Sequence, residues 1–279
     1  MNEGFFQFDI SLLRPISAFA LLGFLLSLEW RIPFRVPIQA KFRHAATNLV
    51  IGGTNAVVVN LVMGGILLFL TSQVETQGWG LLHHVGLRPL VNFAASVVLL
   101  DLIFYGVHWA NHHVPFLWRL HRAHHSDLDL DVTTAQRFHL GEVLISTLIK
   151  AAAIPIVGVS WMGLLIFELV LQAATQFQHS NLRLPEPIDK GVRYLVVTPH
   201  MHWIHHSHRP QEHNTNFGTI FSGWDRMFRT YFLQVHQEEI RVGLDEYPTP
   251  AHVCLLPFHT MPFGGGCRLN RTEQAGGEV

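Results

Sequence analysis

Histidine is the residue type in this sequence that is best placed to do chemistry. The chain has 20 histidines, more than its 19 lysines and arginines together. The segment HWANHH places His108 and His112 four residues apart, the triplet His-x-x-His-His occurs twice, in HRAHH and HWIHH, and QFQHSN contributes the single residue His179. Because imidazole is the commonest metal-ligating side chain, this pattern indicates a metal centre.

The two triplets are the most specific part of the pattern. Each is expected to direct three imidazoles from about one turn of helix toward a common point, and two facing triplets could enclose a pair of metal ions. A tetrahedral zinc site would leave most of these histidines unused, whereas two metals with open positions would use them. Imidazole binds iron, zinc, copper and nickel, so the ligand type leaves the metal open. The candidate ligands are His108, His112, His121, His124, His125, His179, His202, His205 and His206.

The other histidines are assigned weaker roles. Those remote from the boxes are expected to be interfacial or hydrogen-bonded residues: His44, His83, His84, His236, His252 and His259. Four neighbours of the boxes stay open between metal contact and structure: His113, His200, His208 and His213. For the cluster of Arg137, His139 and Glu142, a structural or supporting hydrogen-bond network is favoured over direct ligation, although a metal contact by His139 stays open.

Several polar residues lie within apolar runs, where an ionisable group is costly. Asp101 and Tyr105 share a helix face with His108, and Asp101 is predicted to accept a hydrogen bond from a ligand imidazole and so fix its orientation. Glu168, Thr175 and Gln172 form a second polar stripe that leads to His179. This stripe is expected to face the protein interior and to support the metal centre.

The apolar runs themselves predict the elements that position the histidines. Helices that cross or partly cross a bilayer are expected over residues 10–30, 45–72 and 90–107, and as a hairpin over 141–178 with its turn at Pro155 and Gly158. About four spans or partial spans result. The polar segment 179–263 is expected to form a helical cap that carries histidine boxes, and residues 264–279 are expected to be disordered. The prediction is therefore one membrane-embedded, all-α catalytic domain over residues 1–263.

Composition agrees with a bilayer protein and excludes other classes. Hydrophobic residues make up 49% of the chain and charged residues 14%, and the acidic and basic residues nearly balance, so no basic surface for nucleic acid is expected. Two cysteines, Cys254 and Cys267, exclude a cysteine-rich metal site. The first apolar run lacks the features of a cleaved signal peptide and is expected to be a retained anchor.

Basic residues predict the orientation in the membrane. Arg31, Arg35, Lys41 and Arg43 crowd the first connection, whereas the second has Arg88 alone. The first connection should therefore be cytoplasmic, with the N-terminus outside. Every histidine box then falls on the cytoplasmic side.

The order of the histidine boxes resembles that of the fatty acid hydroxylase / sterol desaturase superfamily of membrane di-iron enzymes. The resemblance covers roughly residues 90–232 and includes the stretches RFHLGE, TPHMHWIHHS and NTNFGTIFSGWDRMFRTY. It implies two iron ions, O2, a lipid substrate and two electrons from an external donor of the cytochrome b5, ferredoxin or flavoprotein type. The chain departs from many members at Trp109, where they carry arginine, and at Thr175, where some carry a further ligand.

Two functions follow from these observations. The first is a membrane-bound oxidoreductase that uses O2 at a di-iron centre to hydroxylate or desaturate a lipid, whether sterol, fatty acyl or related. The alternative is a non-enzymatic, histidine-rich membrane metal carrier or sensor. A transport path would place ligands near the middle of the bilayer, whereas these histidines gather at span ends, which favours the enzyme.

Overall fold

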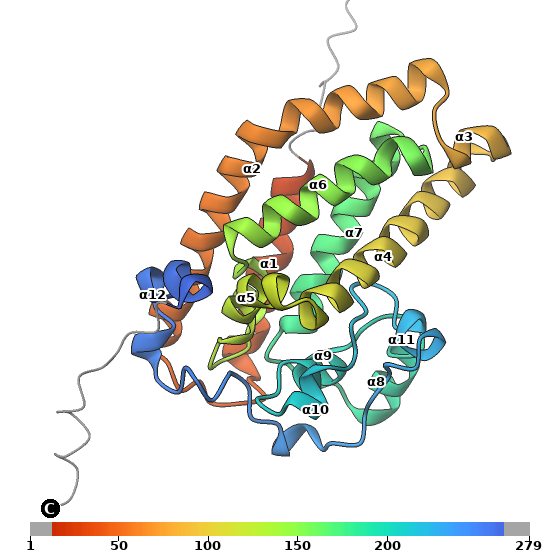
Figure 1. Ribbon diagram of the computed structural model, residues 1–279. Coiled ribbons are helices and arrows are strands. Elements are labelled where there is room, and N and C mark those ends of the chain that lie inside the picture. The colour runs from red at the N-terminus through yellow and green to blue at the C-terminus, as the bar shows by residue number, and fades with distance from the viewer. Residues whose placement is uncertain (1–12, 265–279) are drawn as a thin grey trace, which may run out of the picture.

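The computed structural model describes residues 13–264, and every regular element in that range is a helix (Figure 1). The prediction of an all-α fold is confirmed. The tail expected to be disordered lies, apart from Gly264, outside the described residues, as do Cys267 and the N-terminal residue whose side of the membrane was predicted.

Five long helices form the main bundle: α1 (Leu13–Arg31), α2 (Lys41–Gln77), α4 (Pro89–His113), α6 (Leu140–Val157) and α7 (Trp161–His179). Four helical stretches in the described range are long and apolar enough to cross a membrane: Leu13–Arg31, Lys41–Val85, Pro89–His113 and Leu140–Val157. They match the four predicted spans, and α6 and α7 form the predicted hairpin. The second stretch includes the short helix α3 (Leu81–Val85), and α2 extends beyond both predicted ends.

Local sequence sets the ends of these helices. Proline occupies the first position of α4, where no backbone N–H is needed. The hairpin turns at Gly158, which has a φ of 85° and caps α6, and the hydroxyl of Ser160 then accepts from the backbone N–H of Gly163 to begin α7. A side chain at Gly158 would also collide with the carbonyl oxygen of Trp79, since a Cβ there would lie 2.8 Å from it.

The bundle packs along its length through α2 against α6, and through α7 against both α4 and α1. Its largest buried cluster draws on four of these five helices together with α3, and includes Leu100, Ile154 and Phe167, all fully buried. The outward faces of α1 and α2 are covered with exposed apolar side chains such as Phe24 and Leu61. Such faces suit contact with lipid.

Short helices gather at one end of the bundle, where α4 and α7 end (Figure 1). They are α5 (Pro115–His125), η2 (Val132–Gln136), α8 (Glu186–Val192), α9 (Pro199–His205), α10 (Pro210–His213), α11 (Gly223–Met227), η3 (Gln237–Glu239), η4 (Pro250–His252), α12 (Leu255–Thr260) and η5 (Met261–Phe263). We call this end of the molecule the cap. It carries the second and third histidine boxes, on α5 and α9.

Candidate metal centre

Four helices bring all nine candidate ligands together. The end of α4 supplies His108 and His112, and the end of α7 supplies His179. One triplet lies on α5, and the other lies at the end of α9 and on its C-cap residue, His206. Their ring nitrogens form two adjacent groups, within each of which the potential ligand atoms lie within 4.8 Å of one another. The five-histidine group is His108, His112, His121, His125 and His205, and the four-histidine group is His124, His179, His202 and His206.

The expectation that each triplet converges on one point is wrong. His121 and His125 belong to the five-histidine group, whereas His124 belongs to the other group. On an α-helix, residues four apart differ in direction by about 40°, but consecutive residues differ by about 100°. His124 therefore points away from His125. In the other triplet, His205 belongs to the five-histidine group, whereas His202 and His206 belong to the four-histidine group. Each triplet therefore contributes to both groups.

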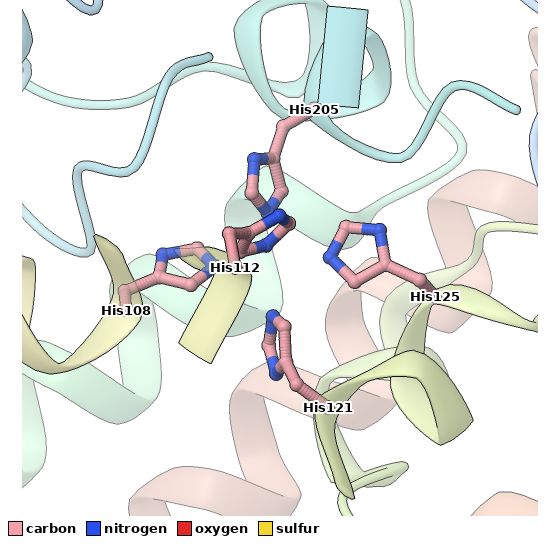
Figure 2. Close-up of side chains that lie close together, drawn as sticks. All are labelled: His108, His112, His121, His125 and His205. Atoms are coloured by element: carbon pink, nitrogen blue, oxygen red, sulfur yellow. The ribbon is translucent and has the colours of Figure 1, made fainter. Parts of the chain in front are cut away.

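The five-histidine group surrounds a common centre. Figure 2 shows its imidazoles pointing toward one another from three different helices. The Nε2 atoms of His112, His121 and His205 and both ring nitrogens of His125 are buried without a hydrogen-bond partner. Buried polar atoms of this kind are costly when unpaired, so their convergence fits a group that accepts their lone pairs.

The four-histidine group is more tightly spaced. The Nε2 atom of His179 lies 3.1 Å from that of His124 and 2.9 Å from that of His202, and the Nε2 atoms of His202 and His206 are 3.1 Å apart. Two nitrogens at right angles around a metal, each about 2.1 Å away, would be roughly 3.0 Å apart. The donor set therefore fits a metal ion in this group as well.

Oxygen acceptors behind the rings orient both groups. The Nδ1–H groups donate to backbone carbonyls, at 2.9 Å from His108 to Phe217, 3.0 Å from His124 to Arg137 and 2.7 Å from His179 to Thr175. Since a carbonyl oxygen can only accept, Nδ1 must carry the proton, which leaves Nε2 with its lone pair. Metal-bound histidines are held in this way. No sequence pattern marks these carbonyls.

Burial favours the neutral form of five histidines in the cap. Their pKa values lie well below the usual 6.5, because burial penalises the charged imidazolium and neighbouring histidines would repel it. These residues are His124, His125, His202, His205 and His206. A neutral imidazole is the form that binds metal.

Aromatic rings surround the two groups. The Phe217 ring, which is fully buried, packs against His108, His112 and His205 at centroid distances of 5.8, 5.1 and 5.7 Å. Phe138 stacks on the His124 ring at 4.2 Å. These contacts limit the access of water to the ring nitrogens.

Two of the predicted supporting residues contact the centre. The Nδ1–H of His121 donates to Glu142 Oε1 at 2.7 Å, and the same oxygen accepts from Asn111 at 3.1 Å. The backbone carbonyl of Thr175 accepts a hydrogen bond from the Nδ1–H of His179, whereas the Thr175 hydroxyl donates to the Leu171 carbonyl within α7. The polar stripe on α7 therefore reaches the metal centre only at its last turn.

Four other predicted supporting residues have partners other than the ligand imidazoles among the described residues, and the predicted hydrogen bond from an imidazole to Asp101 is wrong. Asp101 accepts no hydrogen bond from an imidazole, and instead binds the loop 219–224. Tyr105 bonds the Thr230 hydroxyl at 2.8 Å. His139 caps α6 by accepting from the backbone N–H of Gly141, which is a structural role of the kind that was favoured for its cluster. Glu168 pairs with Lys150 and Arg14 inside the bundle.

A buried network that the sequence did not reveal supports the second box from behind. His44, expected to be interfacial or hydrogen-bonded, contacts Asp127 at 2.9 Å and Asp131 at 3.1 Å. Although burial would raise it, the pKa of Asp127 is held below its usual range by His44 and Arg137. Because the Arg137 carbonyl accepts from His124, this network fixes a wall of the four-histidine group.

The four open neighbours of the boxes lie outside both groups. His213 comes nearest, with its ring 6.0 Å from those of His112 and His125 and stacked on Trp118. His113 is exposed and stacks on Trp109. His200 donates toward the Val235 carbonyl, and His208 faces Asp245 at the surface.

Replacing Glu142 with glutamine is expected to weaken metal binding by roughly 10–100-fold, as the loss of a carboxylate behind a ligand typically does. The amide keeps the shape of the side chain but is a weaker acceptor for the Nδ1–H of His121. Metal retained after titration with a chelator measures the change. Glu239→Gln, the same substitution at an exposed cap residue, is the control and should behave like the parent. Equal retention in both variants would contradict a role for Glu142.

Comparison with known proteins agrees with this geometry. A family model described as Fatty acid hydroxylase matches residues 93–230. An alkylglycerol monooxygenase of Caenorhabditis elegans is 29% identical over 58% of this chain and 31% of its own length. An ornithine lipid hydroxylase of Rhizobium tropici is 28% identical over 53% of this chain and 44% of its own length. A cholesterol 25-hydroxylase of Rattus norvegicus is 25% identical over 57% of this chain and 53% of its own length. The chain thus spans about a third to a half of the length of these relatives. No solved structure matches it significantly.

Proposed function

This chain belongs through residues 93–230 to the fatty acid hydroxylase family, and from that premise we propose that it is a membrane-bound di-iron oxygenase that hydroxylates or desaturates a lipid. The observation that carries the proposal is the pair of adjacent histidine groups, five and four residues strong. Each group alone has enough nitrogen donors for one metal. Their proximity suits a reaction that uses both.

The proposed ligands are the nine histidines of the two groups, and the proposed metal is iron. An iron pair bound there would supply the reductive activation of O2 and the attack on an unactivated C–H bond. Burial lowers the pKa of five of these histidines and so favours their neutral form, and Glu142 and backbone carbonyls fix the directions of the rings. Phe217 and Phe138 keep water from the rings.

The substrate is proposed to be a lipid because the relatives' names specify an ornithine lipid, cholesterol and alkylglycerol. Sterol, fatty acyl and related chains remain the candidates. In a hydroxylation, one atom of O2 enters the C–H bond and the other leaves as water, which consumes two electrons and two protons. An external donor of the cytochrome b5, ferredoxin or flavoprotein type would supply the electrons.

The histidine groups are proposed to lie on the cytoplasmic side of the membrane. The first connection, which carries the basic residues, belongs to the cap: the Arg35 guanidinium donates to the carbonyls of Gln237 and Ile240 and stacks 4.8 Å over the Trp203 ring. Trp203 neighbours His202 in the chain. The side of the basic connection is therefore also the side of the metal centre.

The alternative of a metal carrier or sensor is less well supported. A carrier needs a path by which the ion enters and leaves, whereas the four-histidine group is almost fully buried, with exposed fractions of 2% or less. Two of its members, His124 and His179, are also held in place by Nδ1–H groups that donate to backbone carbonyls. This arrangement suits a resident metal.

The test is to incubate membranes that contain the protein or its His202→Ala variant with ¹⁸O2 and a reducing system, and to compare their lipids by mass spectrometry. Hydroxylation predicts a labelled lipid and desaturation predicts a lipid that has lost two hydrogens, in both cases only with the unmodified protein. Purified protein should hold about two irons per chain, one for each histidine group. Loosely held zinc together with metal uptake by vesicles would favour the carrier.

A further inference from the structure

An exposed apolar surface of the cap lies beside α4 on two segments, residues 193–197 and residues 217–229, the second of which includes the short helix α11. Its large side chains are Tyr194, Leu195, Met227 and Phe228, with exposed fractions of 79%, 62%, 56% and 50%. We call these four residues the loop patch. In a region surrounded by water such a surface would be costly, because the free energy is lower when apolar area is removed from water.

The two segments are joined into one surface. The backbone N–H of Val197 donates to the Ile220 carbonyl at 3.0 Å, and that of Ser222 donates to the Leu195 carbonyl at 3.1 Å. The Arg226 guanidinium donates to the Arg193 carbonyl at 2.8 Å and lies over the ring of Tyr194. The four side chains of the loop patch are therefore parts of a single rigid surface.

The attachment of this surface to α4 indicates its depth. Asp101 accepts from the backbone N–H groups of Ile220 and Phe221 at 3.0 Å and from the Trp224 indole at 2.8 Å. Asp101 precedes His108, where the apolar run of α4 ends, by seven residues, which corresponds to roughly 10 Å along the helix. The segment 220–224 therefore lies about 10 Å farther along α4 toward the membrane interior than the metal centre.

Irregular backbone at that depth must have its polar groups satisfied by protein, because lipid offers no hydrogen bonds. The Asp101 carboxylate satisfies the backbone N–H groups of Ile220 and Phe221. The Asp225 carboxylate satisfies those of Phe217 and Gly218, at 2.7 and 2.9 Å. Polar groups thus face inward while the apolar side chains of the loop patch face outward.

From these observations we propose that the loop patch inserts into the lipid bilayer beside α4, as an in-plane contact in addition to the spanning helices. The partner is the acyl-chain region just below the lipid headgroups, at the depth of about 5–10 Å that interfacial segments reach. Exposed cations close to the patch in the chain, Lys190, Arg226 and Arg229, suit the phosphate level of a membrane surface. This inference goes beyond the proposed oxygenase function and holds whether or not the chain binds iron.

The contact with lipid extends toward the metal centre through stacked rings. Phe228 of the loop patch stacks on Tyr105 at 5.1 Å, Tyr105 meets Phe217 at 6.5 Å, and Phe217 packs on the five-histidine group. The proposed bilayer contact is thus separated from the histidines by two aromatic side chains. If the loop patch inserts as proposed, lipid rather than an aqueous partner lies next to that wall.

Spin labels can test the insertion. Single cysteines replace Leu195 or Met227 in the full chain, with Cys254 and Cys267 changed to serine, and the labelled proteins are placed in lipid nanodiscs. At both sites the label is expected to be more accessible to O2, which dissolves in the bilayer, than to a water-soluble nickel chelate. Glu239→Cys, at an exposed polar position of the cap, is the matched control and should show the opposite preference.

Labels at 195 and 227 that are as accessible to the nickel chelate as the control would overturn the proposal. Poor access of both reagents to both sites would overturn it too, and would indicate that protein covers the patch. Since both side chains point outward, neither substitution removes a core contact. The readout needs no iron, donor or substrate, so it is independent of the outcome for the enzymatic function.

Discussion

His202→Ala and His125→Ala are each expected to lower turnover by more than about 100-fold, since even the loss of a residue behind a ligand costs roughly 10–100-fold. Their effects on metal content should differ. Removal of His202 leaves three histidines in the four-histidine group, whereas removal of His125 leaves four in the other group. We therefore expect His202→Ala to lose about one of two irons and His125→Ala to retain more of its iron.

The combined variant tests whether the two groups act as one centre. If one reaction needs both metals, the double variant should be no less active than the worse single variant, because residues that act as a unit are strongly non-additive. Iron content per chain and turnover of lipid in reconstituted membranes are the two measurements.

His113→Ala is the matched control for these variants. His113 adjoins the first box, but it is exposed and lies outside both groups, so its loss should change neither iron content nor turnover. Two irons and full turnover in both His125→Ala and His202→Ala would refute the assignment of the nine ligands.

The sequence was sufficient to select nine histidines that the fold brings together, but not to divide them into the two groups. Spacing places His121, His124 and His125 on one turn, and local geometry alone allows them to share a target. The division arises because α9 and the end of α7 approach α5 from a direction that only the packing of the bundle determines. His179, which the chain presents alone, supplies the ring that links His124 to His202.

Charged residues in apolar runs show a different limit of sequence analysis. The cost of burial correctly indicated that Asp101 and Glu168 have specific partners, but their identities were wrong. The donors to Asp101 lie 118–123 residues away in the chain, and Glu168 pairs with Lys150 across the hairpin. A lysine in the apolar run of α6 was the available signal for that pair. Nothing in the sequence marks the loop 219–224 as the partner of Asp101.

Asp101→Leu is expected to be among the most destabilising single changes in the chain. Four donors converge on this carboxylate: the Thr219 hydroxyl, the backbone N–H groups of Ile220 and Phe221, and the Trp224 indole. Leucine accepts none of them. An unsatisfied buried donor costs about 1–3 kcal/mol, so several at once approach the whole stability of a typical domain.

Asp101→Asn should be intermediate between the parent and the leucine variant. The amide oxygen can replace one carboxylate oxygen, which serves Thr219 and Ile220, but the amide NH2 group cannot accept from Phe221 and Trp224. About half of the acceptor capacity is lost. The expected order of melting temperature in detergent is therefore parent, Asn, then Leu, with correspondingly less protein in the membrane.

Metal binding separates this structural role from the direct role that the sequence suggested. Because Asp101 contacts no histidine within residues 13–264, the fraction of Asp101→Asn protein that remains folded should hold as much iron as the parent, with the same affinity. Ser96→Ala is the control on the same helix, since Ser96 only donates to the Asn92 carbonyl within α4 and its loss should cost about 1 kcal/mol or less. A normal melting temperature combined with weakened iron binding in Asp101→Asn would contradict the role in holding the loop and restore a role in orienting a ligand.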